Sequence, residues 1–240
     1  MAIDFPASPT VGQLYTYAGK TWKWNGKGWE LVAGVGPTGA TGAGSPGATG
    51  PTGSAGGGVV QSGGKVLIQA QTVASTVATV DFTSGIDATY DEYELHYYNV
   101  VLSDTSGNTL FCIRISQDAG TTWKSGASDY QWTAAYMGDG GNVSAIGSLT
   151  AAYIQLSYYN TPANAVPIVG VTRFWTPANT TLKKVFMTDI NGQGISGTDL
   201  YRGVATGFYY TNNNAINGVR LFPNLGNITS GVFKLYGIKN

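Results

Sequence analysis

The chain has 240 residues, with 13 basic and 13 acidic side chains and a formal net charge of +0 at pH 7. Charged residues make up 11% of it, less than half of the roughly 25% that is usual in globular proteins. Nucleic acids and anionic membranes are bound by clustered Lys and Arg, so this composition argues against both as partners. No window reaches the roughly 20 apolar residues of a membrane-spanning helix, so membrane insertion is not expected.

Cysteine and histidine are too scarce for most catalytic or metal chemistry. The single cysteine, Cys112, excludes an internal disulfide framework and lies in an apolar run, where a buried, inert thiol is expected. The single histidine is His96. No nucleotide-binding, zinc or calcium motif is present, so no cofactor or metal is expected and no enzymatic activity is predicted. Residues 1–6 have neither a basic start nor an apolar run, so no secretory leader is expected.

Residues 1–33 have the pattern of a small three-stranded β-meander. The strand-like runs are 12–17, 20–24 and 29–32, separated by the turn signals Ala18-Gly19 and Asn25-Gly26. A meander of this size buries too little apolar area to be secure alone. Trp22, Trp24 and Trp29 are therefore expected to pack against a neighbouring copy or another protein and so to anchor the chain. An exposed platform that stacks on sugars is the alternative.

Residues 34–58 carry glycine at every third position, apart from one slip of register. These glycines are Gly36, Gly39, Gly42, Gly44, Gly47, Gly50, Gly53 and Gly56. A collagen triple helix requires this spacing, because only hydrogen fits where three polyproline II strands meet at the axis. A flexible Gly/Ser/Thr linker is the alternative. So short a collagen-like shaft needs flanking units that hold three chains in register, so the spacing predicts a homotrimer.

Residues 59–240 have the pattern of an all-β domain. The strand-like runs are 65–72, 77–82, 92–102, 109–116, 130–137, 151–158, 166–175, 182–190, 203–210, 217–222 and 231–238. No stretch shows sustained apolar spacing of three and four, so no helix of consequence is expected. This number of short strands predicts a β-sandwich, and specifically a jelly-roll-like one.

Two sets of side chains in this domain are candidates for binding. Alternation along 92–98 places Glu92, Glu94 and His96 on one face of a strand, where a solvated face is expected and a pair of glycan-cleaving carboxylates is the alternative. Aromatic side chains on a charge-poor surface suit contact with sugars, and equally suit trimer interfaces. The candidate glycan contacts are Trp132, Tyr136, Tyr209 and Tyr210.

The segment 116–123, Ser-Gln-Asp-Ala-Gly-Thr-Thr-Trp, matches the Asp box, S-x-D-x-G-x-T-W, of sialidases and other propeller proteins. A propeller needs several copies at regular spacing, and this chain has one. We therefore expect a structural hairpin. In it, Asp118 accepts hydrogen bonds from backbone amides, Gly120 takes a positive φ, and Trp123 packs beneath the turn.

Taken together, the chain resembles bacteriophage tail-fibre and related virion appendage proteins. The resemblance is carried by three stretches: the start, with Phe5-Pro-Ala-Ser-Pro-Thr-Val-Gly-Gln-Leu-Tyr and Trp22-Lys-Trp-Asn-Gly-Lys-Gly-Trp; the collagen-like segment; and the β-rich remainder, including the ending Gly231-Val-Phe-Lys-Leu-Tyr-Gly-Ile-Lys. A weaker resemblance is to the hair-like glycoproteins of spore coats. No stretch is a residue-specific functional motif, so the resemblance implies an architecture and no active site.

The resemblance implies a role for each of three segments. Residues 1–33 would be a β module that anchors the chain to other virion proteins, 34–58 the trimeric shaft, and 59–240 the distal head on the surface of the phage particle. The expected function is that of a short tail or head fibre whose head contacts the host surface. The alternatives are a tailspike-like enzyme that degrades glycans, a purely architectural capsid or baseplate decoration, and a bacterial spore or surface filament.

Overall fold

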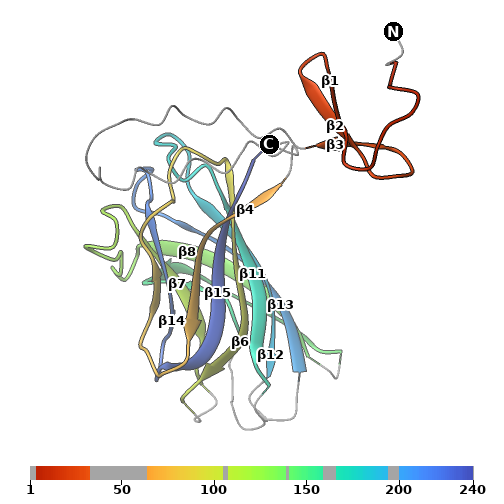
Figure 1. Ribbon diagram of the computed structural model, residues 1–240. Coiled ribbons are helices and arrows are strands. Elements are labelled where there is room, and N and C mark those ends of the chain that lie inside the picture. Colours follow the sequence, from red (N-terminus) through yellow and green to blue (C-terminus); the bar gives the residue numbers. More distant parts are fainter. Residues whose placement is uncertain are drawn as a thin grey trace, which may run out of the picture. The chain divides into compact units, whose positions relative to one another are not determined.

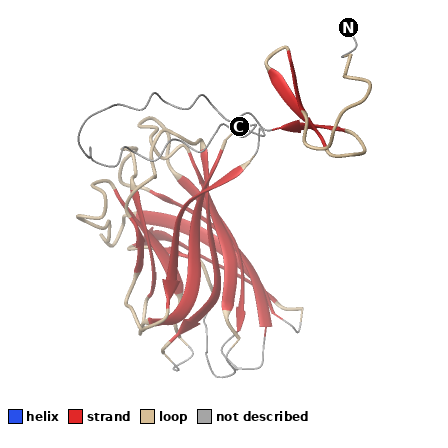
Figure 2. Ribbon diagram, in the orientation of Figure 1, coloured by secondary structure: helices blue, strands red, loops and turns tan. Residues whose placement is uncertain are grey.

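The computed structural model describes residues 4–32, 64–104, 108–138, 141–158, 166–193 and 200–239. The chain divides into two compact units, Met1–Gly56 and Gly57–Asn240. All regular structure in the described residues is β-strand, without a helix, as predicted (Figure 2). Accordingly, no helix that could cross a membrane occurs in these residues. The glycine repeat of residues 34–58 lies outside them, so the triple helix stays a prediction.

The N-terminal unit contains the predicted three-stranded antiparallel meander. Its strands are β1 (Leu14–Tyr17), β2 (Lys20–Trp24) and β3 (Trp29–Val32), paired in that order. Ala18 and Gly19 turn the chain with φ angles of 49° and 76°, the left-handed conformation that a two-residue hairpin turn needs. The second turn is closed by Asn25, whose side-chain oxygen accepts from the amides of Lys27 and Gly28 at 2.9 and 2.8 Å.

The C-terminal unit consists of two antiparallel sheets (Figure 1). The larger has eight strands in the order β4-β15-β6-β11-β12-β13-β8-β9, and the smaller has four in the order β10-β7-β14-β5. The strands are β4 (Lys65–Val73), β5 (Val80–Phe82), β6 (Glu92–Leu102), β7 (Phe111–Ser116), β8 (Tyr130–Gly138), β9 (Val143–Ala151), β10 (Ile154–Gln155), β11 (Ile168–Trp175), β12 (Val185–Gln193), β13 (Leu200–Tyr209), β14 (Gly218–Pro223) and β15 (Ile228–Ile238).

The two sheets pack face to face around one apolar core, and the alternation of each strand explains which side chains enter it. Along β6, Tyr93, Leu95 and Tyr97 are buried, as their spacing predicts. Tyr97 of the large sheet meets Phe111 of the small sheet edge to face, with ring centroids 5.3 Å apart. Tyr93 also stacks on Phe174 of β11 at 5.3 Å. Aromatic packing of this kind therefore joins neighbouring strands as well as the two layers.

The predicted strands are largely present, with one omission, one run that is mostly not strand, and several bounds shifted by up to three residues. β9 was not predicted, because most residues of Val143–Ala151 are small (Ser, Ala, Gly or Thr) and give little apolar alternation. Met137 pairs with Val143 across the turn between β8 and β9, and the amide of Gly138 donates to the carbonyl of Asn142 at 3.0 Å. The run 151–158, predicted as one strand, holds only the end of β9 and the short β10.

Candidate functional site: the outer face of the eight-stranded sheet

The eight-stranded sheet has one face against the small sheet and a second face, the outer face, that no described residue of the C-terminal unit covers as a layer. Three rows of paired side chains cross β11, β12, β13, β8 and β9 on this face. They are Arg173, Met187, Thr206, Thr133 and Gly147; Val171, Asp189, Val204, Ala135 and Ala145; and Val169, Asn191, Arg202, Met137 and Val143. Directly paired residues point to the same face, so these rows are contiguous.

The part of the face over β12, β13, β8 and β9 is apolar and exposed. Met137, Val143, Met187 and Val204 have exposed fractions of 50%, 64%, 52% and 51%. We call these four side chains, with Ala135 and Ala145 between them, the outer patch. Because the two alanines are small, the patch contains a hollow of about 440 Å³. Contiguous apolar surface of this kind is typical of interaction sites.

Two further hollows adjoin the first, so that a shallow groove crosses the sheet. One, of about 430 Å³, lies over β6 and β11 to β13 and shares Arg173 and Asp189 with the first hollow; the other, of about 310 Å³, shares Thr133 and Thr206. The hollow over β6 and β11 to β13 is lined by polar side chains such as His96 and Asn191. The hollow of about 310 Å³ is lined by Trp132, Leu149 and Phe208. The groove is therefore polar at one end and apolar at the other.

Glu94 lies at the polar end and is buried, although a solvated strand face was expected. Its side chain is 4% exposed, and its carboxylate accepts from Arg173 Nε at 2.8 Å and lies 2.7 Å from His96 Nε2. Lys65, at the start of β4, also pairs with it. The expectation of a solvated face is wrong for Glu94, because Lys65 and Arg173 come from the strands β4 and β11, and their positions depend on strand pairing.

The electrostatics of Glu94 do not fit the general acid of a glycan-cleaving pair of carboxylates. Burial by itself raises the pKa of this carboxyl group. The hydrogen bonds from its three neighbours outweigh burial and lower the pKa from 4.5 to about 2. A general acid needs a raised pKa, so Glu94 does not have the properties of a proton donor. No group of three or more potential metal ligands occurs among the described residues.

A second ion pair lies on the same face, next to the outer patch. Arg202 donates to both oxygens of Asp189, at 3.2 and 2.7 Å. These bonds, together with the charges of Arg202 and Arg173, lower the pKa of Asp189. Two clusters of charge on the outer face are thus paired, Asp189 with Arg202 and Glu94 with Lys65 and Arg173. Lys234 of β15, opposite His96 on the same face, instead lies over the ring of Tyr98, 5.5 Å from its centroid.

The four predicted glycan contacts do not form one surface. Tyr136 and Tyr209 are 2% and 4% exposed and belong to the core, so the prediction that they meet a ligand is wrong. Trp132 packs partly against the core and lines the third hollow, and its indole nitrogen is buried without a hydrogen-bond partner in the described part of the chain. Tyr210 alone is well exposed, at 50%. Tyr209 is the last residue of β13 and points into the core, whereas Tyr210 follows the strand and is exposed.

The tryptophans predicted to anchor the chain gather around Phe5 in the N-terminal unit. The Phe5 ring stacks on Trp29, with centroids 5.2 Å apart, and meets Trp22 edge to face at 5.5 Å. Trp24 in turn lies 5.6 Å from Trp29. None of the described residues of this unit is fully buried. The rings therefore have a packing partner within their own unit that sequence reasoning missed, and they still keep exposed surface.

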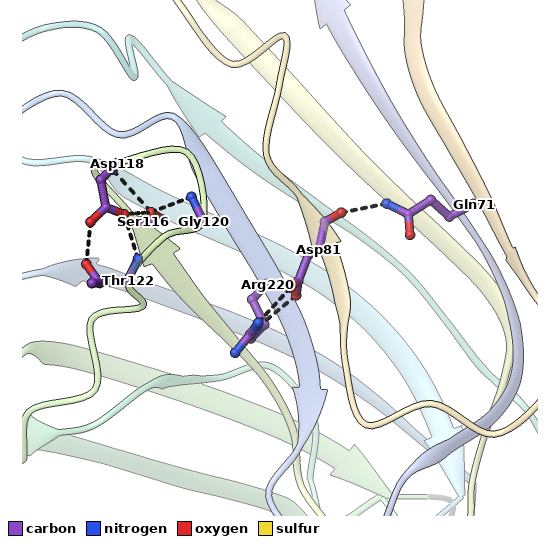
Figure 3. A network of polar contacts seen from close by, with 7 residues as sticks. All are labelled: Gln71, Asp81, Ser116, Asp118, Gly120, Thr122 and Arg220. Atoms are coloured by element: carbon purple, nitrogen blue, oxygen red, sulfur yellow. Dashed lines mark hydrogen bonds and ion pairs between the residues drawn. The ribbon is translucent and has the colours of Figure 1, made fainter.

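The Asp-box segment follows β7 and forms the expected turn, although it is not a hairpin. Asp118 accepts from the amide of Thr122 at 2.8 Å and from Ser116 Oγ at 2.6 Å (Figure 3). Hydrogen bonds from Ser116 and then Thr122 lower the pKa of Asp118 from 3.8 to about 2. Gly120 has the predicted positive φ, at 86°. The next strand, β8, belongs to the other sheet, so the turn joins two layers rather than two paired strands.

Beside this turn, a second network ties the sheets together. Arg220 of β14 donates to both carboxylate oxygens of Asp81 at 2.8 and 2.6 Å, and its guanidinium lies 4.4 Å from the ring of Trp123. Gln71 of β4, in the large sheet, donates to the carbonyl of Asp81 in the small sheet at 2.6 Å (Figure 3). Trp123 is thus held beside the turn by Arg220. This network has the properties of a structural link.

Two potentially reactive side chains, those of Cys112 and Lys184, are buried. Cys112 is fully buried, as predicted, and burial raises the pKa of its thiol. Lys184 is 2% exposed, and its ammonium donates to the carbonyl oxygens of Asn179, Leu182 and Asn213. Burial lowers the pKa of Lys184. Nothing in the sequence distinguishes this lysine from its neighbour Lys183, so its role could not be predicted.

Comparisons of the chain with protein-family models, with curated proteins and with solved structures found no match.

Proposed function

We propose that this chain is a structural protein of a bacteriophage particle, a short homotrimeric tail or head fibre. In this proposal the N-terminal unit attaches to another virion protein, residues 34–58 wind into a collagen-like shaft, and the C-terminal unit is the distal head. The observation that carries the proposal is the glycine spacing between two β units, which keeps its phase on both sides of one slip.

The strand order supports a jelly-roll-like head. Eight strands divide between the layers: β4, β6, β11 and β15 lie in the large sheet, and β5, β7, β10 and β14 in the small one. Taken in chain order, successive strands of this set lie in different layers, except β7 and β10. The first of these strands lies beside the last, and the second beside the second-last. This order supports our proposal of a jelly roll, in which β8, β9, β12 and β13 would extend the larger sheet.

The chemistry of the head favours binding over catalysis. The groove on the outer face combines the ion pairs of Glu94 and Asp189 with apolar side chains such as Met187 and Val204, which suit contact with a largely uncharged surface. Glu94, the best candidate for a tailspike-like hydrolase, is engaged by three donors and stays ionised. We therefore propose attachment to the host surface as the role of the head. A purely architectural decoration or a bacterial spore or surface filament would share the trimeric assembly and differ in its location.

Native mass measurement of the purified full-length chain tests the assembly, with a trimer expected and a monomer contradicting the proposal. Gly47→Ser places a side chain at the crowded axis, whereas Ala48→Ser in the same triplet places the same side chain outside it. We expect Gly47→Ser to abolish the circular-dichroism signal of a triple helix and Ala48→Ser to retain it. Equal signals in the two variants would show that the segment is a linker. Immunolabelling of intact particles would then show where the N-terminal unit is attached.

A further inference from the structure

We infer that the polar hollow, the hollow of about 430 Å³ over β6 and β11 to β13, binds a neutral sugar unit of a host-surface glycan. The inference rests on the proposed attachment of the head to a host surface, and it adds the class of ligand and the place where it binds. The side chains assigned to the sugar are Tyr98, Val169, Val171, Asp189, Asn191 and Arg202.

A prearranged set of hydrogen-bonding groups lines the hollow over β12 and β13. Arg202 donates to both oxygens of Asp189, at 3.2 and 2.7 Å, so each side chain holds the other in place. Asn191 is paired directly with Arg202, and its side-chain amide makes no hydrogen bond to another described residue. A sugar hydroxyl both donates and accepts, whereas the carboxylate accepts, the guanidinium donates and the amide does both. Two adjacent hydroxyls of a sugar therefore find complementary partners here.

The side of the hollow over β6 and β11 adds apolar surface. Val169 and Val171 alternate outwards on β11, with Val169 42% exposed, and Tyr98 of β6 adds an aromatic ring. A sugar is amphipathic, since its C–H groups pack against apolar and aromatic side chains while its hydroxyls need polar partners. The volume of the hollow also lies within the roughly 300–1,000 Å³ of small-ligand sites.

The charges of the lining favour a neutral ligand over an acidic one. Arg202 is paired with Asp189 and Arg173 with Glu94, so both arginines of the lining already have a carboxylate partner. Lys234 has no carboxylate partner among the described residues, but it lies over an aromatic ring of β6 and is not part of the lining. An acidic ligand gains most from a cation that is not already paired, whereas neutral hydroxyls bond to charged groups without requiring a net charge.

The strand β6 is distorted beside the hollow, at the position of Tyr98. Between Tyr97 and Val100, β6 advances three residues while its partner β11 advances two, so β6 contains a bulge. Asn99 within the bulge has a φ of 55°, the left-handed conformation that residues other than glycine seldom adopt. Bulges are over-represented next to active sites, where they redirect a side chain. A bulge in a central strand, at the wall of the hollow, therefore supports a ligand at this place.

Saturation-transfer difference NMR on the full-length protein tests the site. The neutral probes are the methyl glycosides of glucose, galactose, mannose, rhamnose, N-acetylglucosamine and N-acetylgalactosamine, and the acidic probes are glucuronic acid and N-acetylneuraminic acid. We expect transfer to at least one neutral glycoside and weaker transfer to both acids. Asn191→Ala and Tyr98→Ala should each lower the affinity for that glycoside about fivefold, because each removes one contact with the sugar.

Two matched variants change the same residue types outside the hollow. Asn142→Ala removes an exposed asparagine from the turn between β8 and β9. Tyr210→Ala removes a 50% exposed tyrosine that follows β13. Both should bind the glycoside as the wild type does. Circular dichroism checks that all four variants fold.

The possible outcomes distinguish this inference from the proposed function. Absence of transfer to every neutral glycoside, or equal affinity in Asn191→Ala, Tyr98→Ala and the wild type, would overturn the inference and leave the proposed trimer standing. Preferred binding of an acidic probe would overturn the neutral class of ligand, and loss of binding in Tyr210→Ala alone would assign the sugar to a different surface. A monomer by native mass measurement, with binding that depends on Asn191, would overturn the trimer and support the hollow as a sugar site.

Discussion

Nε of Arg173 lies 2.8 Å from Oε1 of Glu94, on the strand directly paired with its own, and the Glu94 side chain is only 4% exposed. Lys65 from β4 and His96 from β6 itself complete the set of donors. Glu94 of β6 therefore links β4 and β11 on the outer face of the sheet, although these two strands are far apart in the sequence. A buried carboxylate of this kind is tolerated only while its partners are present.

We expect Glu94→Gln to destabilise the C-terminal unit by about 2 kcal/mol near neutral pH, because the amide cannot replace three charge-assisted hydrogen bonds. The pH dependence follows from the lowered pKa. A carboxyl group with a folded pKa of about 2, against 4.5 when unperturbed, contributes stability that is present above pH 4.5 and lost as the pH falls towards 2. Urea unfolding at several pH values measures both effects.

Glu92→Gln is the matched control, since Glu92 on the same strand face lies 3.9 Å from Arg173 Nε and is more exposed, at 23%. The difference in free energy of unfolding between wild type and Glu94→Gln should shrink as the pH is lowered from 4.5 to 2. A difference that stays constant over this range would show that the ionised carboxylate of Glu94 does not stabilise the fold.

Gly120 is the position where the Asp-box turn depends most on glycine. Its φ is 86°, and a Cβ there would lie 2.4 Å from Thr83 Cγ2. We expect Gly120→Ala to lower the free energy of unfolding by about 1–3 kcal/mol, through backbone strain and this close contact. Gly138→Ala is the control, because a Cβ at Gly138 meets nothing within 4 Å. Equal midpoints of urea unfolding for the two variants would contradict the strained geometry.

Tyr136 and Tyr210 were both predicted to contact glycan, and the structure gives them opposite environments. Tyr136 packs edge to face on Tyr201 and is 2% exposed, whereas Tyr210 is 50% exposed. Tyr136→Ala should cost about 3 kcal/mol of stability by opening a cavity in the core, and Tyr210→Ala less than about 1 kcal/mol. Thermal unfolding of the two variants measures this. Similar losses of stability in both would mean that Tyr136 is not a core residue.

The strands could be predicted from the sequence because each shows its own alternation, and β6 and β2 were predicted with their exact bounds. Strand pairing could not be predicted. Glu94 was expected in solvent because nothing local shows that Lys65 and Arg173 lie beside it. The outer patch was missed for the same reason, since Val204 becomes its centre only once β13 is paired with β8 and β12.

Local composition also misled in two places. In a tyrosine-rich chain, Tyr136 and Tyr209 were expected at the surface. The core in fact uses tyrosine rings as its largest buried side chains, because the ring is mostly apolar. In the N-terminal unit, Phe5 precedes the first strand and has no periodic neighbours, so its place among the tryptophans was not visible. A residue outside the regular elements is predicted only when its tertiary partners are known.

Phe5 gives the last prediction, which concerns the N-terminal unit. Its ring contacts Tyr15, Trp22 and Trp29 at centroid distances of 5.4, 5.5 and 5.2 Å. Because none of the described residues of this unit, 4–32, is fully buried, these aromatic contacts are a large share of their packing, and Phe5→Ala should destabilise the meander by about 2–3 kcal/mol. We expect faster amide hydrogen exchange in β1 to β3 and unchanged exchange in the C-terminal unit. Val11→Ala, at a 77% exposed position, should leave both units unchanged. Unaltered exchange in Phe5→Ala would mean that the meander is held by contacts outside its own unit, as the tryptophans were first expected to be.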